Sequence, residues 1–238
     1  ILPEAGSVIT AGVDTQDDRL EVELVGWAAG EESWSLAYEV IWGDPARPEA
    51  WEQLDRVLAQ RFARSGNLPP LGIGATAIDS GGHRTPEVMR YAQARQARRV
   101  WAIKGRGGAG ITPWPKRPPK PSTFRLTPVY IVGVDGIKTA LQARMRLEEP
   151  AAGYLHMPAD RDLDWYQGLT SERPIRRYVK GVPRIEWVKD SGVRNEPLDC
   201  RVYATAALHG LYAAGFKFAA LPENTAMNTP KVIKSKWM

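Results

Sequence analysis

The segment 9–27 constrains the fold of this chain most strongly, because two hydrophobic patterns meet there across a short turn. An apolar run begins at Ile9 and ends in Asp14, and a polar cluster follows at 15–18. Apolar and acidic side chains then alternate strictly: Leu20, Val22 and Leu24 on one side, Glu21 and Glu23 on the other. Alternation with period two is typical of a strand that buries one face. The segment therefore predicts a β-hairpin whose second strand is half-buried.

Asp14 is expected where the first strand of this hairpin leaves the hydrophobic interior. A carboxylate in such a place is costly unless it is paired, hydrogen-bonded or bound to a metal. Two interpretations stay open from this segment alone. Asp14 either caps the turn with its side chain or serves as a functional acid.

The next elements place a second aspartate in a similar position. An aromatic and β-branched strand over 32–42 completes an antiparallel meander. Apolar residues at helical spacing then predict an amphipathic helix over roughly 48–64. A crossover through this helix favours a following strand that runs parallel to the first. That strand begins at Leu71 and ends in Asp79, just before two glycines that permit a sharp turn.

A second helix, with Thr85 as its predicted N-cap and Pro86 in its first turn, ends in a basic cluster. Arg95, Arg98 and Arg99 form this cluster, and they are either a solvated helix end or contacts to a DNA backbone.

The segment 104–120 is a long basic loop rich in glycine and proline. It formally contains G-x-G-x-x-G after a strand, but prolines follow where a dinucleotide site needs a helix, so we reject that interpretation. A plain loop is one alternative, and a flap that contacts DNA is the other. The candidate DNA-binding residues are Lys104, Arg106, Lys116, Arg117 and Lys120.

Further elements are predicted beyond this loop. A strand over 129–134 leads into a helix capped by Asp135, with Lys138 on its polar face, and a hairpin is predicted over 176–189. Pro197 suits the first turn of a last helix that is apolar nearly all round and is therefore expected to be buried. Asp199 lies in its first turn, where a third carboxylate can meet Asp14 and Asp79. We expect one domain over 1–221 and a C-terminal tail or linker over 222–238.

Charge, cysteine content and hydropathy exclude several classes of protein. The formal net charge is +5, which fits a polyanionic partner without requiring one. The single cysteine excludes an internal disulfide, and the three histidines lie at no zinc-like spacing from it. No apolar run approaches the roughly 20 residues of a membrane span. The chain begins with Ile1 rather than methionine, so we expect a part of something longer.

Three carboxylates from two strand ends and one helix start predict a metal site, because such acids repel one another unless cations hold them. Hard oxygen ligands select Mg²⁺ or Mn²⁺. Two such ions activate water and stabilise the leaving oxygen of a phosphodiester. We expect Asp14 and Asp79 to hold the first ion and Asp199 the second, with water as the nucleophile.

Secondary candidates lie around these acids. Asp17, Asp18 and Glu196 are either additional ligands or ordinary turn and cap residues. His83 is either a phosphate or water contact or a surface histidine, and Arg201 is positioned in sequence to screen the acid cluster.

Several motifs together resemble the C-terminal nuclease domain of lambda-type tailed-phage terminase large subunits. The resemblance covers residues from about 7 to 213, in the order of the family, with Pro197 where the family commonly has alanine. The motifs are Ala11 to Arg19, Glu31 to Trp34, Asp79 to Gly82, Ile103 to Gly105 and Arg194 to Cys200.

This resemblance implies an α/β, RNase H-like fold, in which a central mixed sheet combines an antiparallel three-strand meander with parallel strands and is flanked by helices. It implies an endonuclease that cuts concatemeric viral DNA during genome packaging, with Asp14, Asp79 and Asp199 as catalytic acids that bind two divalent metal ions. The implied partners are double-stranded DNA, an N-terminal ATPase domain in the full chain, the terminase small subunit and the portal. The implied location is the cytoplasm of the infected bacterial host, with no membrane association.

Other functions remain open from the residues themselves. Resolvases and transposases with an RNase H-like fold share the same two-ion chemistry. A DNA-binding or portal-docking module without catalysis is the non-enzymatic alternative. If the aspartates are only caps, their removal lowers stability and affects no activity.

Overall fold

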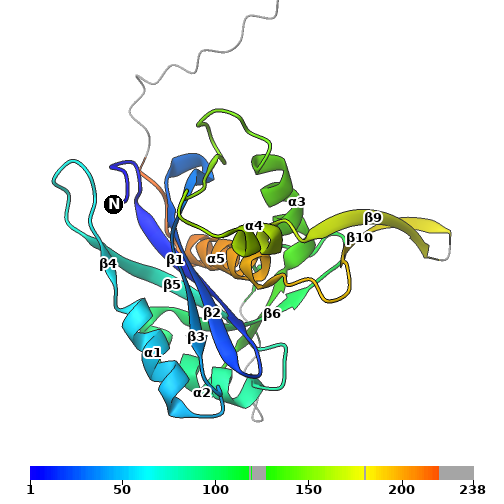
Figure 1. Ribbon diagram of the computed structural model, residues 1–238, viewed down its shortest axis with the longest axis horizontal. Helices are drawn as coiled ribbons and strands as arrows, with labels where there is room; N and C mark the ends of the chain where they lie inside the picture. Colours follow the sequence, from blue (N-terminus) through cyan, green and yellow to red (C-terminus); the bar gives the residue numbers. More distant parts are fainter. Residues whose placement is uncertain (118, 120–126, 180, 220–238) are drawn as a thin grey trace, which may run out of the picture.

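The computed structural model describes residues 1–117, 119, 127–179 and 181–219 (Figure 1). Its strands are β1 (Val8–Thr15), β2 (Arg19–Trp27), β3 (Ser33–Trp42), β4 (Arg61–Phe62), β5 (Leu71–Asp79), β6 (Val100–Arg106), β7 (Val129–Gly133), β8 (Leu155–His156), β9 (Glu172–Val179) and β10 (Val182–Lys189). Its helices are α1 (Pro48–Leu58), α2 (Thr85–Ala94), α3 (Val134–Arg144), α4 (Leu163–Leu169) and α5 (Glu196–Ala213), with short 3-10 turns η1 (Ala29–Glu31) and η2 (Gln96–Arg98).

The centre of the fold is a mixed sheet with strand order β7-β6-β5-β1-β2-β3-β8. The strands β1, β2 and β3 form the antiparallel meander that the sequence predicts. The strand β5 pairs parallel to β1, and β6 and β7 continue in the same sense, so the predicted crossover is confirmed. The parallel register of β1 with β5 brings the ends of these two strands to one edge of the sheet.

Helices cover both faces of this sheet (Figure 1). One hydrophobic core joins α1 and α2 to side chains such as Val13 and Val22, and the other joins α3, α4 and α5 to Ala75 and Ala77. The last helix is buried along most of its length, as its nearly continuous apolar sequence predicts. No helix in the described part of the chain is long and apolar enough to span a membrane.

Gly12 allows α5 to lie directly on β1. A Cβ atom at this position would come 1.9 Å from the carbonyl oxygen of Cys200 and 2.4 Å from the backbone nitrogen of Ala204. Both atoms belong to the helix backbone, so no side-chain rotation can relieve the clash. The first turns of α5 are thereby held over the end of β1, which positions Asp199 near Asp14.

Replacing Gly12 by alanine is expected to displace α5 and to lower the free energy of unfolding by about 3 kcal/mol, the upper range for overpacking a core. Gly136 is the matched control, because a Cβ there meets nothing within 4 Å. Gly136→Ala lies inside α3 and is expected to stabilise the fold by about 1 kcal/mol. Urea denaturation measures both effects, and equal stabilities of the two variants would contradict the close packing.

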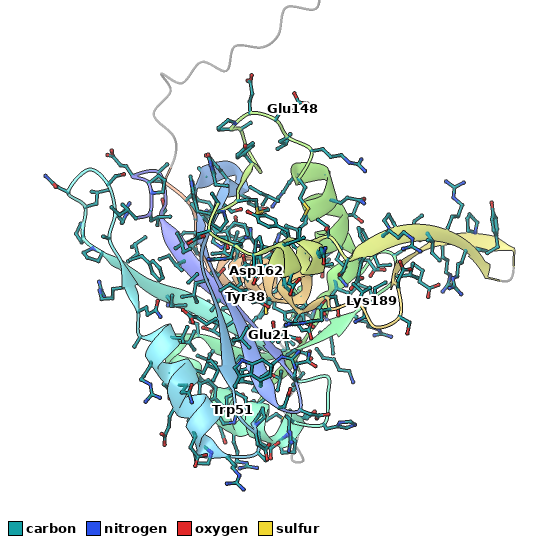
Figure 2. All side chains as sticks on the ribbon, viewed as in Figure 1. Glu21, Tyr38, Trp51, Glu148, Asp162 and Lys189 are labelled. Carbon is teal, nitrogen blue, oxygen red and sulfur yellow. The ribbon has the colours of Figure 1, made fainter. Side chains whose placement is uncertain are left out.

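The prediction of a half-buried β2 is wrong. Leu20, Val22 and Leu24 face one core as expected, but the side chains of Glu21 and Glu23 are also fully buried. They lie under α5, where cationic and hydroxyl side chains bind them; Figure 2 shows Glu21 in the interior with Tyr38, whose hydroxyl group donates a hydrogen bond to it.

Local boundaries also differ from the sequence predictions. The helix predicted over 48–64 ends at Leu58, because Arg61 and Phe62 leave the helix and pair with β5. The N-cap of α2 is Arg84 rather than Thr85, whose hydroxyl donates to the carbonyl oxygens of Ser80 and Gly82.

Asp135 does not cap α3 either. The N-cap is Gly133, and the Asp135 carboxylate accepts a hydrogen bond from the backbone N–H of Gly108 at 2.8 Å. It therefore fastens the start of the glycine-rich loop to the helix.

Two of the three arginines at the basic end of α2 form ion pairs within the protein. The guanidinium group of Arg95 binds both carboxylate oxygens of Asp55, and Arg98 contacts the same carboxylate at 3.3 Å. Arg99 is exposed and ends η2 in the left-handed backbone region. A DNA contact is therefore disfavoured for Arg95, whose guanidinium group already binds Asp55, whereas Arg98 shares the same carboxylate and its side chain is 49% exposed.

Asp55→Asn is expected to reduce stability by about 1 kcal/mol at neutral pH. Burial raises the pKa of the Asp55 carboxyl, but hydrogen bonds from Arg95 and Tyr91 outweigh burial and hold the pKa below its ordinary value of 3.8. The stabilisation is therefore complete above that value and is lost as the pH falls through the lowered pKa. Urea melts of both proteins across the acid range measure this, and a stability difference that persists in strong acid would contradict it.

Candidate active site

The three aspartates selected from the sequence lie on the face of the sheet that α5 covers. Asp14 and Asp79 each follow the aligned pair Val13 and Ile78 of the parallel strands β1 and β5. The hydroxyl group of Thr15 donates to the carbonyl oxygen of Asp79 at 3.1 Å and ties the two strand ends together. Asp199 comes from the first turn of α5.

Asp14 is buried among the other acids. Burial raises the pKa of its carboxyl well above the ordinary value, and the charges of Asp199 and Asp79 raise it further. The side-chain amide of Gln16 donates a hydrogen bond to its Oδ2 at 2.5 Å, which acts in the opposite direction. The carboxylates are therefore near enough to repel one another.

Asp79 is contacted by backbone N–H groups and lies near a lysine. Burial raises the pKa of its carboxyl, while the backbone N–H groups of Gly81 and Ser80 and the charge of Lys104 lower it. The two residues after the strand thus orient this carboxylate, and Lys104 lies near enough to interact with it. Lys104 itself is exposed.

Asp199 is held by a polar network formed by the N-cap of its own helix and by side chains of α3 and β9. Asn195 donates to its Oδ2 at 2.7 Å, and the ammonium group of Lys138 lies 3.5 Å from its Oδ1. Lys138 also binds both oxygens of Glu172 at 2.8 Å. Burial raises the pKa of the Asp199 carboxyl to about 6, with Lys138 lowering it and Glu172 and Asp79 raising it.

The donor set fits divalent cations chemically. It offers hard carboxylate oxygens, partly shielded from water, whose mutual repulsion a cation would relieve. As placed, however, no group of three or more His, Cys, Asp or Glu side chains in the described part of the chain is arranged to hold a metal ion. The amide groups of Gln16 and Asn195 and the ammonium group of Lys138 instead contact carboxylate oxygens of Asp14 and Asp199.

Of the secondary candidates, Asp17, Asp18 and His83 lie on the surface, and Glu196 lies near the acids. Asp17 and His83 are exposed and lie 3.4 Å apart, and Asp18 pairs with Arg19 in the turn, so these side chains belong to the surface. Glu196 is largely buried and pairs with Arg19 and Arg194. The charge of Glu196 still raises the pKa of the Asp14 carboxyl, so Glu196 lies at the edge of the candidate site.

Arg201 does not screen the acid cluster. It is fully buried and binds Glu23 through two hydrogen bonds, of 2.9 Å from Nε and 2.5 Å from Nη2. Arg201 lies two residues after Asp199 in α5, so its side chain points toward β2. Its charge therefore pairs with Glu23 in the protein interior.

The basic loop is described only in part. Lys104, Arg106, Lys116 and Arg117 are exposed, whereas Lys120 lies outside the described residues. No helix follows the glycines among the described residues before β7, in agreement with the rejected dinucleotide site. Trp114 packs against Trp101 and Tyr130, with ring centroids 4.9 Å and 4.6 Å apart, and so anchors the loop to the sheet.

Sequence reasoning missed Lys138, Glu172, Asn195 and Gln16 as neighbours of the acids. The sequence predicts Lys138 on a polar helix face, yet only 7% of this residue is exposed. Its position opposite Glu172 arises from tertiary packing, and no local pattern signals it. Gln16 carried a usable signal, because it lies two residues after Asp14 in the predicted turn.

Comparisons with known proteins identify the family of this chain. A family model described as the terminase large subunit gpA endonuclease domain matches residues 1–217. Since this match covers most of the chain, the chain belongs to that family.

Two relatives named as the large subunit of terminase are similar over most of the chain. The protein of Escherichia phage lambda is 32% identical over 216 residues, which cover 87% of this chain and 33% of that protein. The protein of Enterobacteria phage P21 is 30% identical over 212 residues, covering 84% of this chain and 32% of its own length. The chain thus spans about a third of the length of these curated relatives. No solved structure matches it.

Proposed function

We propose that this chain is a metal-dependent endodeoxyribonuclease that cuts concatemeric viral DNA during genome packaging. The observation that carries the proposal is the placement of three carboxylates on one face of the sheet: Asp14 is buried, and Asp79 and Asp199 are partly buried. Their burial and mutual repulsion are unfavourable for folding, which is expected of a site that binds cations. Membership in a family described by its endonuclease domain supports the same reaction.

The fold proposed for this domain is RNase H-like. In its favour are the antiparallel meander, the parallel strands that follow it, and a late helix that carries the third acid. We assign the nuclease domain to 1–221 and a tail or linker to 222–238, a segment that lies outside the described residues.

Asp14 and Asp79 would hold one divalent ion and Asp199 a second, with Mg²⁺ or Mn²⁺ as the fitting metals. When bound, the ions supply activation of a water nucleophile and stabilisation of the leaving oxygen.

The protein's own residues prepare this site. The backbone N–H groups of Ser80 and Gly81 orient Asp79, and the side-chain amides of Gln16 and Asn195 orient Asp14 and Asp199, the carboxylates that would hold the ions. Lys104 is exposed beside Asp79 and would bind a phosphate of the DNA backbone, together with the basic side chains of the loop.

The proposed partners are double-stranded DNA, an N-terminal ATPase domain of the full protein, the terminase small subunit and the portal. The proposed place of action is the cytoplasm of the infected bacterial host. In support of both assignments, two relatives from bacteriophages are named as large subunits of terminase.

Cleavage of supercoiled plasmid tests the proposal. The wild-type chain is expected to nick and linearise plasmid with Mn²⁺ or Mg²⁺ and to be inactive in EDTA. Isothermal titration with Mn²⁺ is expected to detect binding that Asp79→Asn weakens. DNA binding without cleavage under any metal would favour the non-catalytic alternative and contradict the proposed reaction.

A further inference from the structure

The strands β9 and β10 form a two-stranded ribbon that extends away from the body of the protein (Figure 1). Among the described residues, β9 and β10 pair only with each other, and they are separate from the central sheet. An isolated two-stranded ribbon is only marginally stable in water. A ribbon that protrudes without a core is therefore expected to serve as a contact surface.

The outer part of this ribbon exposes apolar and aromatic side chains. Tyr178 is 68% exposed, Val182 56% and Ile185 52%. Their exposure is unfavourable in the isolated chain, and a partner that covers the ribbon would remove this apolar surface from water.

Positive charge dominates the same ribbon. The segment 172–189 contains six basic and two acidic residues. Arg177 lies directly opposite Arg184 in the register, so their side chains share one face, where like charges repel. Glu186 binds Arg177 at 2.9 Å, whereas Arg176 and Arg184 have no acidic partner within 4 Å among the described residues. These charges favour a polyanion as the partner.

The root of the ribbon is bonded to the candidate active site through Asn195. The Asn195 side chain donates to Glu172 in β9 at 2.9 Å and to Asp199 at 2.7 Å. Its carbonyl oxygen accepts from the ammonium group of Lys189 in β10 at 2.8 Å, and Figure 2 shows Lys189 where the ribbon joins the body. One side chain thus links both strands of the ribbon to the third acid.

We propose that the β9–β10 ribbon is a DNA-binding arm that grips duplex DNA beside the point of cleavage. Arg176, Arg177 and Arg184 contact backbone phosphates, and Tyr178 and Ile185 enter a groove. The major groove admits a two-stranded β-ribbon, which makes the shapes compatible. The proposal rests on the proposed function, because it takes DNA as the substrate that lies over the acids.

Equilibrium binding of a short blunt DNA duplex in EDTA tests the arm without cleavage. The ribbon variant Arg176→Ser/Arg177→Ser/Arg184→Ser is expected to bind about tenfold or more weakly. Each phosphate contact contributes about 0.9 to the slope of log affinity against log salt concentration, so this slope is expected to fall by about 2 to 3.

The matched control is Arg47→Ser/Arg56→Ser/Arg90→Ser, which removes the same charge from exposed positions at α1 and α2, away from the ribbon (Figure 1). It is expected to change the salt slope much less than the ribbon variant. All substituted side chains are exposed, so thermal melts of both variants are expected to match the wild type.

Two results would contradict the proposal that the ribbon binds DNA. One is wild-type protein that does not bind the duplex, and the other is a ribbon variant whose affinity and salt slope equal those of the control. In the second case the exposed ribbon belongs to a protein partner. The test is independent of catalysis. A wild-type protein that binds DNA through the ribbon but never cuts it would support the proposed DNA-binding arm and contradict the proposed nuclease activity. If cleavage occurs, the ribbon variant is expected to raise KM and leave kcat nearly unchanged.

Discussion

Asp14→Asn and Asp199→Asn are each expected to lower metal-dependent cleavage of duplex DNA by about 10³-fold. Metal ions stabilise the charge of a phosphodiester transition state by several kcal/mol, and each 1.4 kcal/mol corresponds to a factor of ten. An asparagine keeps the shape of the aspartate but has no negative charge to hold the ion. Initial rates on supercoiled plasmid with Mn²⁺ measure this loss.

The same variants are expected to melt at or above the wild-type temperature in EDTA. Asp14 is buried and Asp199 is partly buried, and the charges of other acids raise the pKa of both carboxyls, so the neutral amide removes repulsion from the folded state. Mn²⁺ is expected to raise the melting temperature of the wild type and to have a much smaller effect on either variant.

Asp160→Asn is the control for both readouts, because this carboxylate is 79% exposed and pairs only with Arg161 among the described residues. It is expected to keep the wild-type rate and the metal-induced rise in melting temperature. Variants at Asp14 or Asp199 that cut as fast as this control would show that neither carboxylate is catalytic. Variants that instead melt far lower would identify the aspartates as structural caps.

Arg201→Met is expected to give a large loss of stability, about 3–5 kcal/mol, the range for removal of one partner of a buried ion pair. Its guanidinium group and the Glu23 carboxylate are both fully buried, and Ser35 donates a further hydrogen bond to Glu23 at 2.7 Å. The methionine variant leaves the Glu23 charge without its cation. Urea denaturation at neutral pH measures the loss.

The double variant Glu23→Met/Arg201→Met separates the charge from the packing. A buried ion pair that is replaced by apolar side chains of similar size is often neutral or stabilising. The double variant is therefore expected to recover most of the stability that the single variant loses. A double variant as unstable as Arg201→Met would mean that packing of the arginine stem, rather than its charge, stabilises α5 on β2.

The sequence was most informative where a pattern is local. The strict alternation after Asp14 predicts β2, the apolar run before Asp79 predicts β5, and Pro197 predicts the start of α5; all three elements are present. Parallel pairing of β1 and β5 followed from the crossover rule, since a helix separates these strands.

Predictions failed where a distant element decides burial. Alternation along β2 identifies two faces but cannot show that α5, encoded more than 170 residues later, covers the acidic face. Glu21 and Lys138 therefore have the sequence signature of surface residues while lying in the interior. For the same reason the pairing of Arg201 with Glu23 could not be predicted.

Cys200 gives the chain an intrinsic reporter of the docking of α5. It is the single cysteine, it is fully buried, and its thiol donates to the carbonyl oxygen of Glu21 at 3.1 Å. A thiol reagent can reach it only when the helix lifts from β2, so the rate of modification measures how often Asp199 leaves its place. A cysteine introduced on the surface would react far sooner, which permits a dye at one chosen position without removal of the native thiol.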